Sequence, residues 1–214
     1  MIKWRYGDSW ERFPIEPGQV WGLPGGSAVA VHDIFEPLPR WMRADLLFVD
    51  PPWGLGNLNC FYTKAGRSDY RQSFVEFSDA LLLRIAEIGA TTAYIEMGNQ
   101  FADDWERRLR AAFTHIQRWP VTYYRKHPTN LLRASNAAPT RYDFSSMDEA
   151  DCIAALAKME EYKAIADPCI GRGLVGMAAY KSGHKFVGTE LNKRRLAVLL
   201  DKLSKAGADV RRIE

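Results

Sequence analysis

Residues 46–53 of this chain read Leu46-Leu47-Phe48-Val49-Asp50-Pro51-Pro52-Trp53. Four consecutive apolar residues are typical of a short strand that is buried on both faces. The prolines end this strand, because each has a fixed φ angle and no backbone donor. A carboxylate, rigid carbonyls and an indole ring thus follow at the carboxyl end of a strand, where open α/β sheets bind ligands. We expect Asp50 and a proline carbonyl to accept the two protons of an exocyclic amine, and Trp53 to stack on the base that carries it.

Apolar periodicity predicts strands and helices along most of the chain. Helices are expected at residues 74–88, 101–113, 146–161, 174–182 and 196–203. The helix at 146–161 is expected to begin with a capping box formed by Ser146 and Glu149. Strands are expected at residues 27–31, 46–49, 91–97, 115–125, 164–166 and 185–189, with a break at Pro120. Strands that alternate with helices predict an α/β sheet with helices on both faces.

Three segments lack a sustained period, and we expect them to be irregular. Residues 1–26, rich in Trp, Pro and Gly, are expected to form an arm packed on a single domain that spans residues 1–214. Residues 54–72 contain several Gly and Asn residues, which favour a long loop that acts as a lid beside Asp50. Residues 126–145 are expected to form an irregular basic segment.

The bulk composition limits the class of protein. The 214 residues are 47% hydrophobic with a net charge of +3, which fits one globular domain with a substantial core. No window approaches about 20 apolar residues, and the first residues lack the apolar core of a signal peptide, so no membrane association is expected. Cys60, Cys152 and Cys169 are scattered, as are the four histidines, which favours a reduced, cytoplasmic protein without a metal site.

A second motif, Gly171-Arg172-Gly173-Leu174-Val175-Gly176, follows a predicted strand and begins a predicted helix. It matches the G-x-G-x-x-G pattern, and Glu190 ends the next strand about 20 residues on, where a ribose-binding acid is expected. The glycines let the backbone approach a nucleoside, and Glu190 would bind both ribose hydroxyls. A tight turn with a purely structural role is the alternative interpretation.

The residues beside this turn favour S-adenosylmethionine over a nicotinamide cofactor. Asp167-Pro168 separates the strand from the glycines and adds a carboxylate. A pyrophosphate would gain little from that acid. The ammonium and sulfonium groups of S-adenosylmethionine would be attracted to it, so we expect this cofactor.

Together the two motifs resemble those of the amino-methyltransferases that modify exocyclic amines of DNA bases. Asp50-Pro51-Pro52-Trp53 resembles their catalytic element, and residues 167–173 resemble their cofactor loop. Because the catalytic motif comes first, the chain is similar to the circularly permuted β class. The resemblance implies a Rossmann-like methyltransferase fold: a mainly parallel, seven-stranded twisted sheet with a β-hairpin at one edge and helices on both faces.

The resemblance also implies further cofactor contacts. Asp33 would accept a hydrogen bond from the adenine amine, and Ile34 or Phe35 would line the adenine; a surface turn is the alternative for Asp33. Cys169 and Arg172 depart from the family pattern and should alter the methionine end of the pocket. The remaining contacts are expected from Asp167, Pro168, Gly171, Gly173, Glu190 and Leu191.

Basic and aromatic residues predict a surface for nucleic acid. Residues 107–142 contain many Arg and Lys residues but no Asp or Glu. Such a surface would track phosphates, with aromatic rings available for stacking. Solvated loops and helix faces are the alternative interpretation. The expected contacts are Lys64, Arg67, Arg71, Tyr124, Arg125, Lys126 and Arg133.

The activity that the resemblance implies is methyl transfer from S-adenosylmethionine to a base in DNA, by direct displacement on a flipped-out base. An Asp at the first catalytic position favours adenine N6, with cytosine N4 as the alternative. Methyl transfer to RNA adenine N6, methyl transfer to protein glutamine and a non-catalytic partner subunit also stay open. Only residues 126–145 are available for the target-recognition region that the β class makes larger, so a homodimer or a recognition partner stays open.

Overall fold

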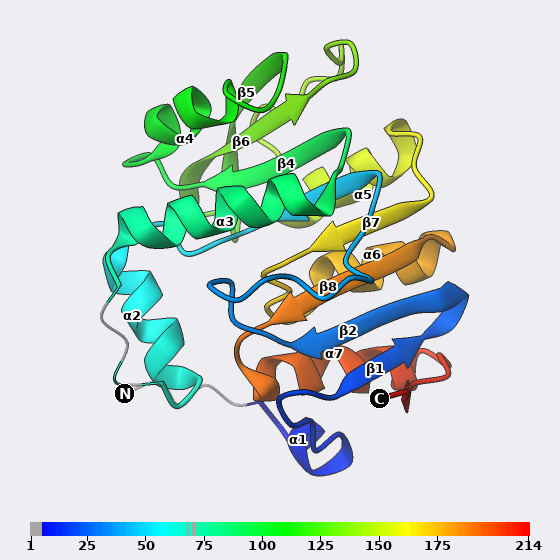
Figure 1. Cartoon of the computed structure of the whole chain (residues 1–214). Helices are drawn as coiled ribbons and strands as arrows, with labels where there is room; N and C mark the ends of the chain where they lie inside the picture. The colour runs from blue at the N-terminus through cyan, green and yellow to red at the C-terminus, as the bar shows by residue number, and fades with distance from the viewer. Residues whose placement is uncertain (1–5, 68, 70–71) are drawn as a thin grey trace.

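The computed structural model describes residues 6–67, 69 and 72–214. Within these residues the chain forms a nine-stranded sheet in the order β5-β6-β4-β3-β7-β8-β2-β1-β9 (Figure 1). The five strands from β4 to β2 run parallel, and the pairs at both edges are antiparallel. The strands are β1 Val20–Leu23, β2 Ser27–Val31, β3 Leu46–Val49, β4 Thr92–Met97, β5 His115–Tyr123, β6 His127–Ser135, β7 Ala164–Asp167, β8 Lys185–Glu190 and β9 Arg211–Arg212.

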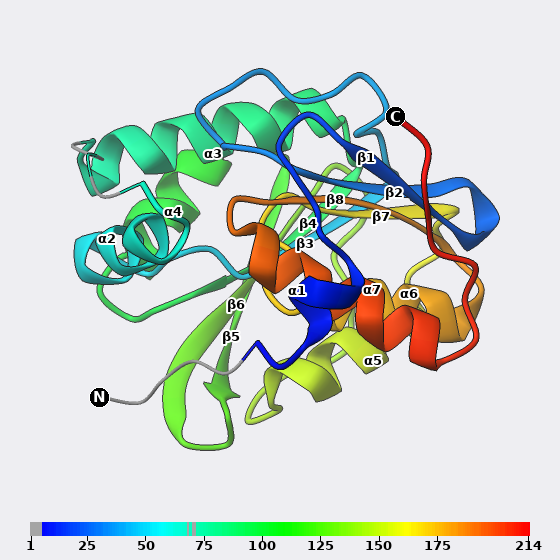
Figure 2. The same ribbon diagram turned by 90° about the horizontal axis from the view of Figure 1, so that it is seen from below.

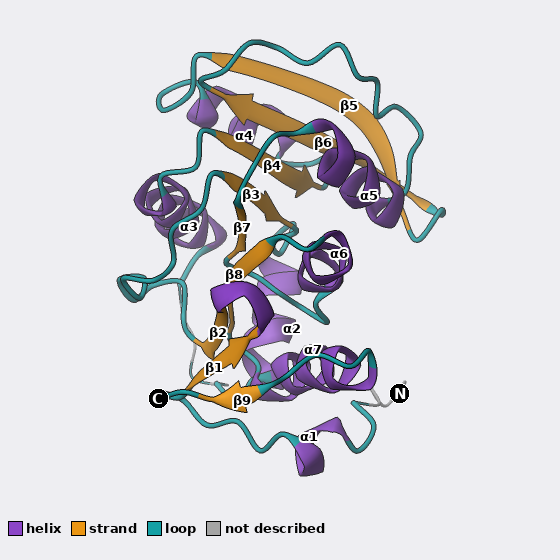
Figure 3. Cartoon of the chain, turned by 90° about the vertical axis from the view of Figure 1, so that its right-hand side faces the viewer, coloured by secondary structure: helices purple, strands orange, loops and turns teal. Residues whose placement is uncertain are grey.

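Helices cover both faces of this sheet, as predicted (Figures 2 and 3). Helices α2, α3 and α4 pack on one apolar cluster, and α5, α6 and α7 pack on the other. Among the described residues, no helix combines the length and apolar character needed to cross a membrane. The helices are α1 Ser9–Arg12, α2 Leu55–Lys64, α3 Phe74–Ile88, α4 Ala102–Leu109, α5 Glu149–Met159, α6 Leu174–Ser182 and α7 Lys193–Lys205.

Strand β3 lies between β4 and β7 and is buried on both faces, as its apolar sequence predicts. Leu46 and Phe48 belong to the core beneath α5, α6 and α7, whereas Leu47 and Val49 belong to the opposite core. Parallel pairing with β7 matches Leu46 to Ile165. The carboxyl ends of β3 and β7 therefore lie side by side, which confirms that the two motifs meet at one edge of the sheet.

Helix α3 has the bounds that its apolar period predicts. Ser73 and Glu76 form a capping box at its start, with the Glu76 amide donating to Ser73 Oγ at 3.2 Å. Gly89 ends the helix in the left-handed region at φ 75°. Local signals and burial agree in this element, and α6 likewise has its predicted bounds.

The sheet is wider than the seven strands expected, and the arm is less irregular than expected. Strand β1 forms a hairpin with β2 through a short 3₁₀ turn at Pro24–Gly26, and β9 pairs with the other side of β1. Gly22 permits this last pairing, because a Cβ at position 22 would lie 2.8 Å from Ile213 Cγ2. Helix α1 packs on α7 (Figure 1). The first and last segments of the chain thus extend one edge of the sheet.

The prediction that residues 54–72 form a long loop is wrong for about half of the segment. Residues Leu55–Lys64 form helix α2 despite their glycines and asparagines. Leu58 and Tyr62, four residues apart, are 0% and 4% exposed and join the core beneath α3. Tertiary burial of this apolar pair outweighs the weak helix propensity of its neighbours.

Three further predictions are wrong between residues 115 and 149. Nearly half of residues 126–145, which were expected to be irregular, belongs to the regular strand β6, which pairs with β4 and β5. Pro120 does not break β5, because β5 is an edge strand. Ser146 has φ 66° and caps nothing; α5 begins at Glu149, with Asp148 at its N-cap.

Candidate active site

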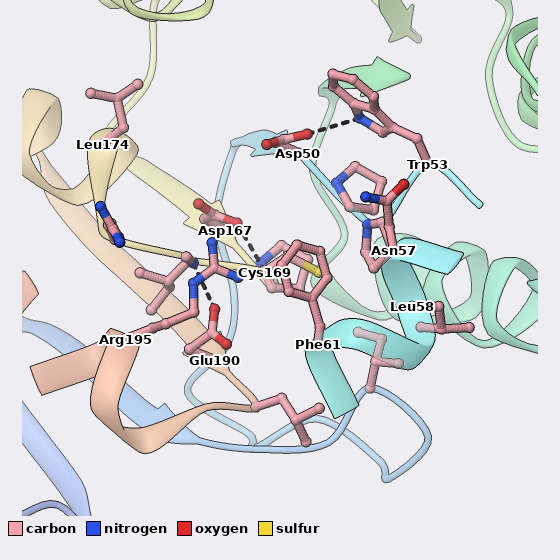
Figure 4. Close-up of a pocket in the computed structure, with 18 of the residues that line it drawn as sticks. Asp50, Trp53, Asn57, Leu58, Phe61, Asp167, Cys169, Leu174, Glu190 and Arg195 are labelled. Atoms are coloured by element: carbon pink, nitrogen blue, oxygen red, sulfur yellow. Dashed lines mark hydrogen bonds between the residues drawn. The ribbon is translucent and has the colours of Figure 1, made fainter. Parts of the chain in front are cut away.

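A cavity of about 490 Å³ opens at the carboxyl ends of the central strands (Figure 4). Asp50 follows β3, Asp167 ends β7 and Glu190 ends β8. These carboxylates face one space, because the three strands are neighbours. Pro51 and Pro52 line the same cavity. The two predicted motifs, which are more than a hundred residues apart in the sequence, therefore build a common pocket.

The residues after β3 form a rigid corner. Trp53 Nε1 donates a 3.0 Å hydrogen bond to Asp50 Oδ1. The indole also packs edge-on against Tyr123, with ring centroids 4.9 Å apart. Gly98 makes room for it, because a Cβ at position 98 would lie 3.0 Å from Trp53 Cβ and 3.2 Å from Cγ. The position of the carboxylate is thus fixed by an indole that is itself held on two sides.

The pocket residues Asp50 and Glu149 and the buried residue Glu96 have raised pKa values. Burial raises the pKa of Asp50 to about 7, although the Trp53 hydrogen bond and the Arg195 charge act against this shift. Burial, with Asp50 as the next cause, raises the pKa of Glu149 to about 8 and that of Glu96 to about 10. At neutral pH Glu96 is therefore protonated, whereas Asp50 and Glu149 titrate near that pH.

The glycine turn is held by the acid that ends the neighbouring strand. The Gly171 amide donates to Glu190 Oε2 at 2.7 Å, and the Asn192 amide donates to Oε1 at 2.9 Å. Gly171 and Gly173 have φ angles of 58° and 79°, which glycine adopts readily. A Cβ at position 173 would also lie 2.7 Å from Leu199 Cβ. Both glycines are required by the turn and by its close packing on α7.

The rest of the predicted cofactor loop also lines the pocket, together with Pro168 and Leu191. The Cys169 amide donates to Asp167 Oδ1 at 2.9 Å. Burial raises the pKa of Asp167 well above its usual value, and it does the same for the pKa of the Cys169 thiol. Arg172 is exposed at the rim. The residues predicted from the loop are therefore together, with a thiol that stays neutral.

The sequence reasoning missed several pocket residues, including three that helices carry into the cavity. Arg195, in the first turn of α7, lies with its guanidinium carbon 4.8 Å from the ring centroid of Phe61, which α2 carries into the pocket (Figure 4). Glu149, at the first position of α5, is the third. One signal was available for Arg195: it lies five residues beyond the ribose-acid position, Glu190, at the start of the next predicted helix. Glu149 was expected to cap a helix, and Phe61 was expected on a loop.

The structure places Asp33 differently from the expectation. Its carboxylate turns toward α2 and accepts hydrogen bonds from Tyr62 Oη at 2.6 Å and Arg67 Nη1 at 3.0 Å. Ile34 lines the cavity, whereas Phe35 packs against Phe77 with ring centroids 6.4 Å apart. Ile34 thus lies where it was predicted, in the pocket wall, and its adenine contact stays a prediction, while Asp33 serves to tie α2 and the segment after it to the end of β2.

The residues predicted to contact nucleic acid lie in different parts of the structure. Tyr124 and Lys64 line the pocket, and Arg125 and Lys126 are exposed at the tip of the β5–β6 hairpin. Arg71 lies outside the described residues. Arg67 is exposed and pairs with Asp33, and its contact with nucleic acid stays a prediction. One assignment is corrected: Arg133 is 3% exposed, with its Nε 2.9 Å from Glu160 Oε1. Arg133 therefore serves the core between β6 and α5.

Comparison with known proteins identifies the fold. No protein-family model and no curated protein sequence matches the chain. Among solved structures, M1.HpyAVI is 13% identical with a TM-score of 0.54, over 82% of this chain and 97% of that one. TTHA0409 of Thermus thermophilus, assigned provisionally as a DNA modification methylase and complexed with S-adenosyl-L-methionine, is 16% identical with a TM-score of 0.56, over 83% and 93%.

A third similar structure is PvuII DNA methyltransferase, described as cytosine-N4-specific, at 11% identity and a TM-score of 0.51, over 80% of this chain and 84% of that one. Identities this low establish a shared fold. The predicted Rossmann-like methyltransferase fold is therefore confirmed, and the chemistry of the site has to be argued from its own residues.

Proposed function

We propose that this protein transfers a methyl group from S-adenosylmethionine to the exocyclic amine of a base in DNA, with adenine N6 as the target. One observation carries the proposal: the Asp50 corner and the glycine turn with Glu190 open into the same cavity from adjacent strands. A base amine at one end and a nucleoside cofactor at the other end would then meet in the middle.

The residues of the glycine end fit a nucleoside. Glu190 uses each carboxylate oxygen once for a backbone amide, and each oxygen keeps a lone pair for a ribose hydroxyl. The positive φ angles of Gly171 and Gly173 bring bare backbone to the cavity wall. Ile34 and Leu191 supply an apolar surface for a base. When bound here, S-adenosylmethionine would supply an electrophilic methyl group.

The Asp50 corner orients the nucleophile. A base must leave the helical stack to enter this pocket. Trp53 would stack on it, while the Asp50 carboxylate and the Pro51 carbonyl accept hydrogen bonds from its amine. These bonds aim the amine lone pair at the methyl group in line with the leaving sulfur. The hydrogen bond from Trp53 and the fixed prolines hold both acceptors in place before the base arrives, which lowers the cost of orientation.

DNA is proposed as the substrate because the pocket opens beside the basic hairpin tip. Tyr124 is 67% exposed and lines the cavity, and Arg125 and Lys126 follow it. An aromatic ring with two adjacent cations suits a strand that passes the pocket entrance. Strand β6 takes up residues 127–135 of the segment 126–145, which leaves residues 136–148 as a loop. Strict sequence recognition by this chain alone is therefore not part of the proposal.

Cytosine N4 is the second candidate target, since the similar PvuII structure is described as cytosine-N4-specific. Adenine is preferred because Asp50 is the first residue of the corner, and the resemblance to the amino-methyltransferases associates an Asp at that position with adenine N6. RNA is a third candidate, as no contact in this pocket depends on a deoxyribose.

The proposal is tested by incubating the protein with methyl-labelled S-adenosylmethionine and, separately, unmethylated DNA, RNA or a protein mixture. Label should enter DNA with the intact chain and not with Asp50→Ala. Asp50→Asn, which keeps the shape and one acceptor, should retain part of the activity. Label in RNA or protein but not in DNA would contradict the proposed substrate, and no transfer to any of them would contradict methyl transfer.

A further inference from the structure

Two ionisable side chains in the pocket, the cation Arg195 and the acid Glu149, lack a hydrogen-bonding partner among the described residues. Each reaches the cavity from the first turn of a helix, Arg195 from α7 and Glu149 from α5. Both line the cavity that Asp50 and the glycine turn also line, and neither is used by the proposed catalytic step. Charging a group in a partly dry pocket without a partner is costly, so this pair points to a ligand that supplies the partners.

Arg195 is held in place without being neutralised. Its guanidinium lies 4.8 Å from the centre of the Phe61 ring, and a Cβ at position 171 would lie 3.1 Å from its Nη2. The nearest candidate acid, Glu190, instead accepts the amides of Gly171 and Asn192. The negative surroundings raise the pKa of Arg195 although burial opposes this, so it remains a cation whose donor fork is free to bind an anion.

Glu149 lines the same cavity as Arg195. The groups that face it are Asp50, Asp167, Asp148 and, with the opposite sign, Arg195. Asp148 is already engaged, because its Oδ1 accepts the Arg125 amide at 2.7 Å. Glu149 is the acid with no donor of its own in the described part of the chain, and a cationic ligand group would supply one.

We propose that Arg195 binds the carboxylate and Glu149 the ammonium of the amino-acid end of the cofactor. The inference rests on the proposed function, since it names how that cofactor is held. A zwitterion matches a cation and an acid that line one cavity, because its ammonium favours the ionised form of the acid. A phosphate does not match, because it would lie among Asp50, Glu149, Asp167 and Glu190. Both residues are thus determinants of cofactor specificity, acting at the end remote from adenine.

The test compares two ligands that share the nucleoside. S-adenosylhomocysteine carries the zwitterion, and 5′-methylthioadenosine lacks it. Binding of each is measured by calorimetry, without methyl transfer, to the full chain and to Arg195→Met and Glu149→Gln. A charge-assisted hydrogen bond contributes roughly 1.5–3 kcal/mol, so each substitution should weaken S-adenosylhomocysteine about 10- to 100-fold. Affinity for 5′-methylthioadenosine should change less than about threefold, which also shows that the variant is folded.

Arg194→Met is the matched control, because Arg194 is the exposed neighbour in the same helical turn. It should leave both affinities unchanged. If the intact chain binds S-adenosylhomocysteine but Arg195→Met and Glu149→Gln keep the full preference over 5′-methylthioadenosine, the inference is wrong and the proposed function stands. Equal weakening of both ligands would also overturn it. If the intact chain binds neither ligand, the proposed cofactor fails and the inference fails with it.

Discussion

The two ends of the pocket are built on different principles. At the glycine end, Glu190 has a backbone amide on each oxygen, and the turn is fixed by positive φ angles and by packing on Leu199. At the corner end, Asp50 accepts a hydrogen bond from Trp53, and burial raises its pKa to about 7. Both oxygens of Glu190 are therefore anchored by the backbone before any ligand binds, whereas Asp50 is anchored by a side chain and titrates near neutral pH.

This difference separates binding from chemistry. Changes at the glycine end should alter stability and cofactor affinity, because its geometry is part of the fold. Changes at the corner should alter transfer more than binding, because its groups become fully paired only when a base amine arrives. Substitutions at each end of the pocket test whether cofactor binding and methyl transfer are separated in this way.

The largest effect is expected from Asp50→Ala. Loss of an acceptor that orients the amine should lower kcat about 10²- to 10³-fold, or roughly 3–4 kcal/mol. Affinity for S-adenosylhomocysteine should stay within about threefold, because Glu190 and the glycine turn are untouched. Single-turnover transfer and calorimetry measure the two quantities. A loss confined to cofactor affinity would contradict the division.

The next largest effect is expected from Gly173→Ala, at the other end. The left-handed backbone and the contact with Leu199 together should cost about 2–5 kcal/mol in the free energy of unfolding. Gly207→Ala is the matched control: its φ is 88°, but nothing lies within 4 Å of the added Cβ. It should cost only about 1–2 kcal/mol. Urea denaturation compares the two, and equal losses would show that packing at the turn is unimportant.

A smaller effect is expected from pH. Unfolded acids lose their protons near pH 4, but the raised pKa values of Asp50, Glu149 and Glu96 keep them protonated in the folded protein until about pH 7, 8 and 10. The folded state therefore binds more protons between these limits, and stability should fall as the pH rises from 5 to 8. Thermal melts of the ligand-free protein should show this, and Glu149→Gln should flatten the decline. A stability that rises between pH 5 and pH 8 would contradict the raised pKa values of these buried acids.

The smallest effects are expected at the hairpin tip. Lys126→Ala should weaken DNA binding a few-fold and lower the salt dependence of log Kd by about one charge, equally for all sequences. Arg211→Ala, an exposed substitution on the edge strand β9, should leave DNA binding unchanged. Fluorescence anisotropy at several salt concentrations measures both. The same loss in both variants would show that general charge, and not the hairpin, attracts DNA.

The fold and the position of the pocket at the carboxyl ends of the strands could be predicted, because local signals and tertiary burial agree in the elements that build them. Helix α3 has its apolar stripe, capping box and terminal glycine, and β3 has its apolar run and prolines. Helix α2 was missed because only tertiary burial of Leu58 and Tyr62 makes it helical. Arg133 was expected to be a surface cation because a basic residue in sequence does not reveal its buried partner, Glu160.

The site itself shows the same division. Asp50, Trp53, Glu190 and the loop glycines were found because their spacing is a property of the chain. Arg195 and Glu149 were not found, because only the fold brings the first turns of two helices to one cavity. Asp33 was assigned a ligand contact that the structure gives to Tyr62 and Arg67. A sequence motif does not show which neighbouring side chains will compete with a ligand for hydrogen bonds to a carboxylate.

The most direct test of the proposed function is the identity of the methylated nucleoside. Unmethylated DNA would be treated with the protein and S-adenosylmethionine, digested to nucleosides and analysed by mass spectrometry against standards. We expect N6-methyldeoxyadenosine, absent when Asp50→Ala replaces the intact chain. N4-methyldeoxycytidine would correct the target base, and unmodified DNA under conditions in which the protein binds S-adenosylhomocysteine would contradict the proposed methyl transfer to DNA.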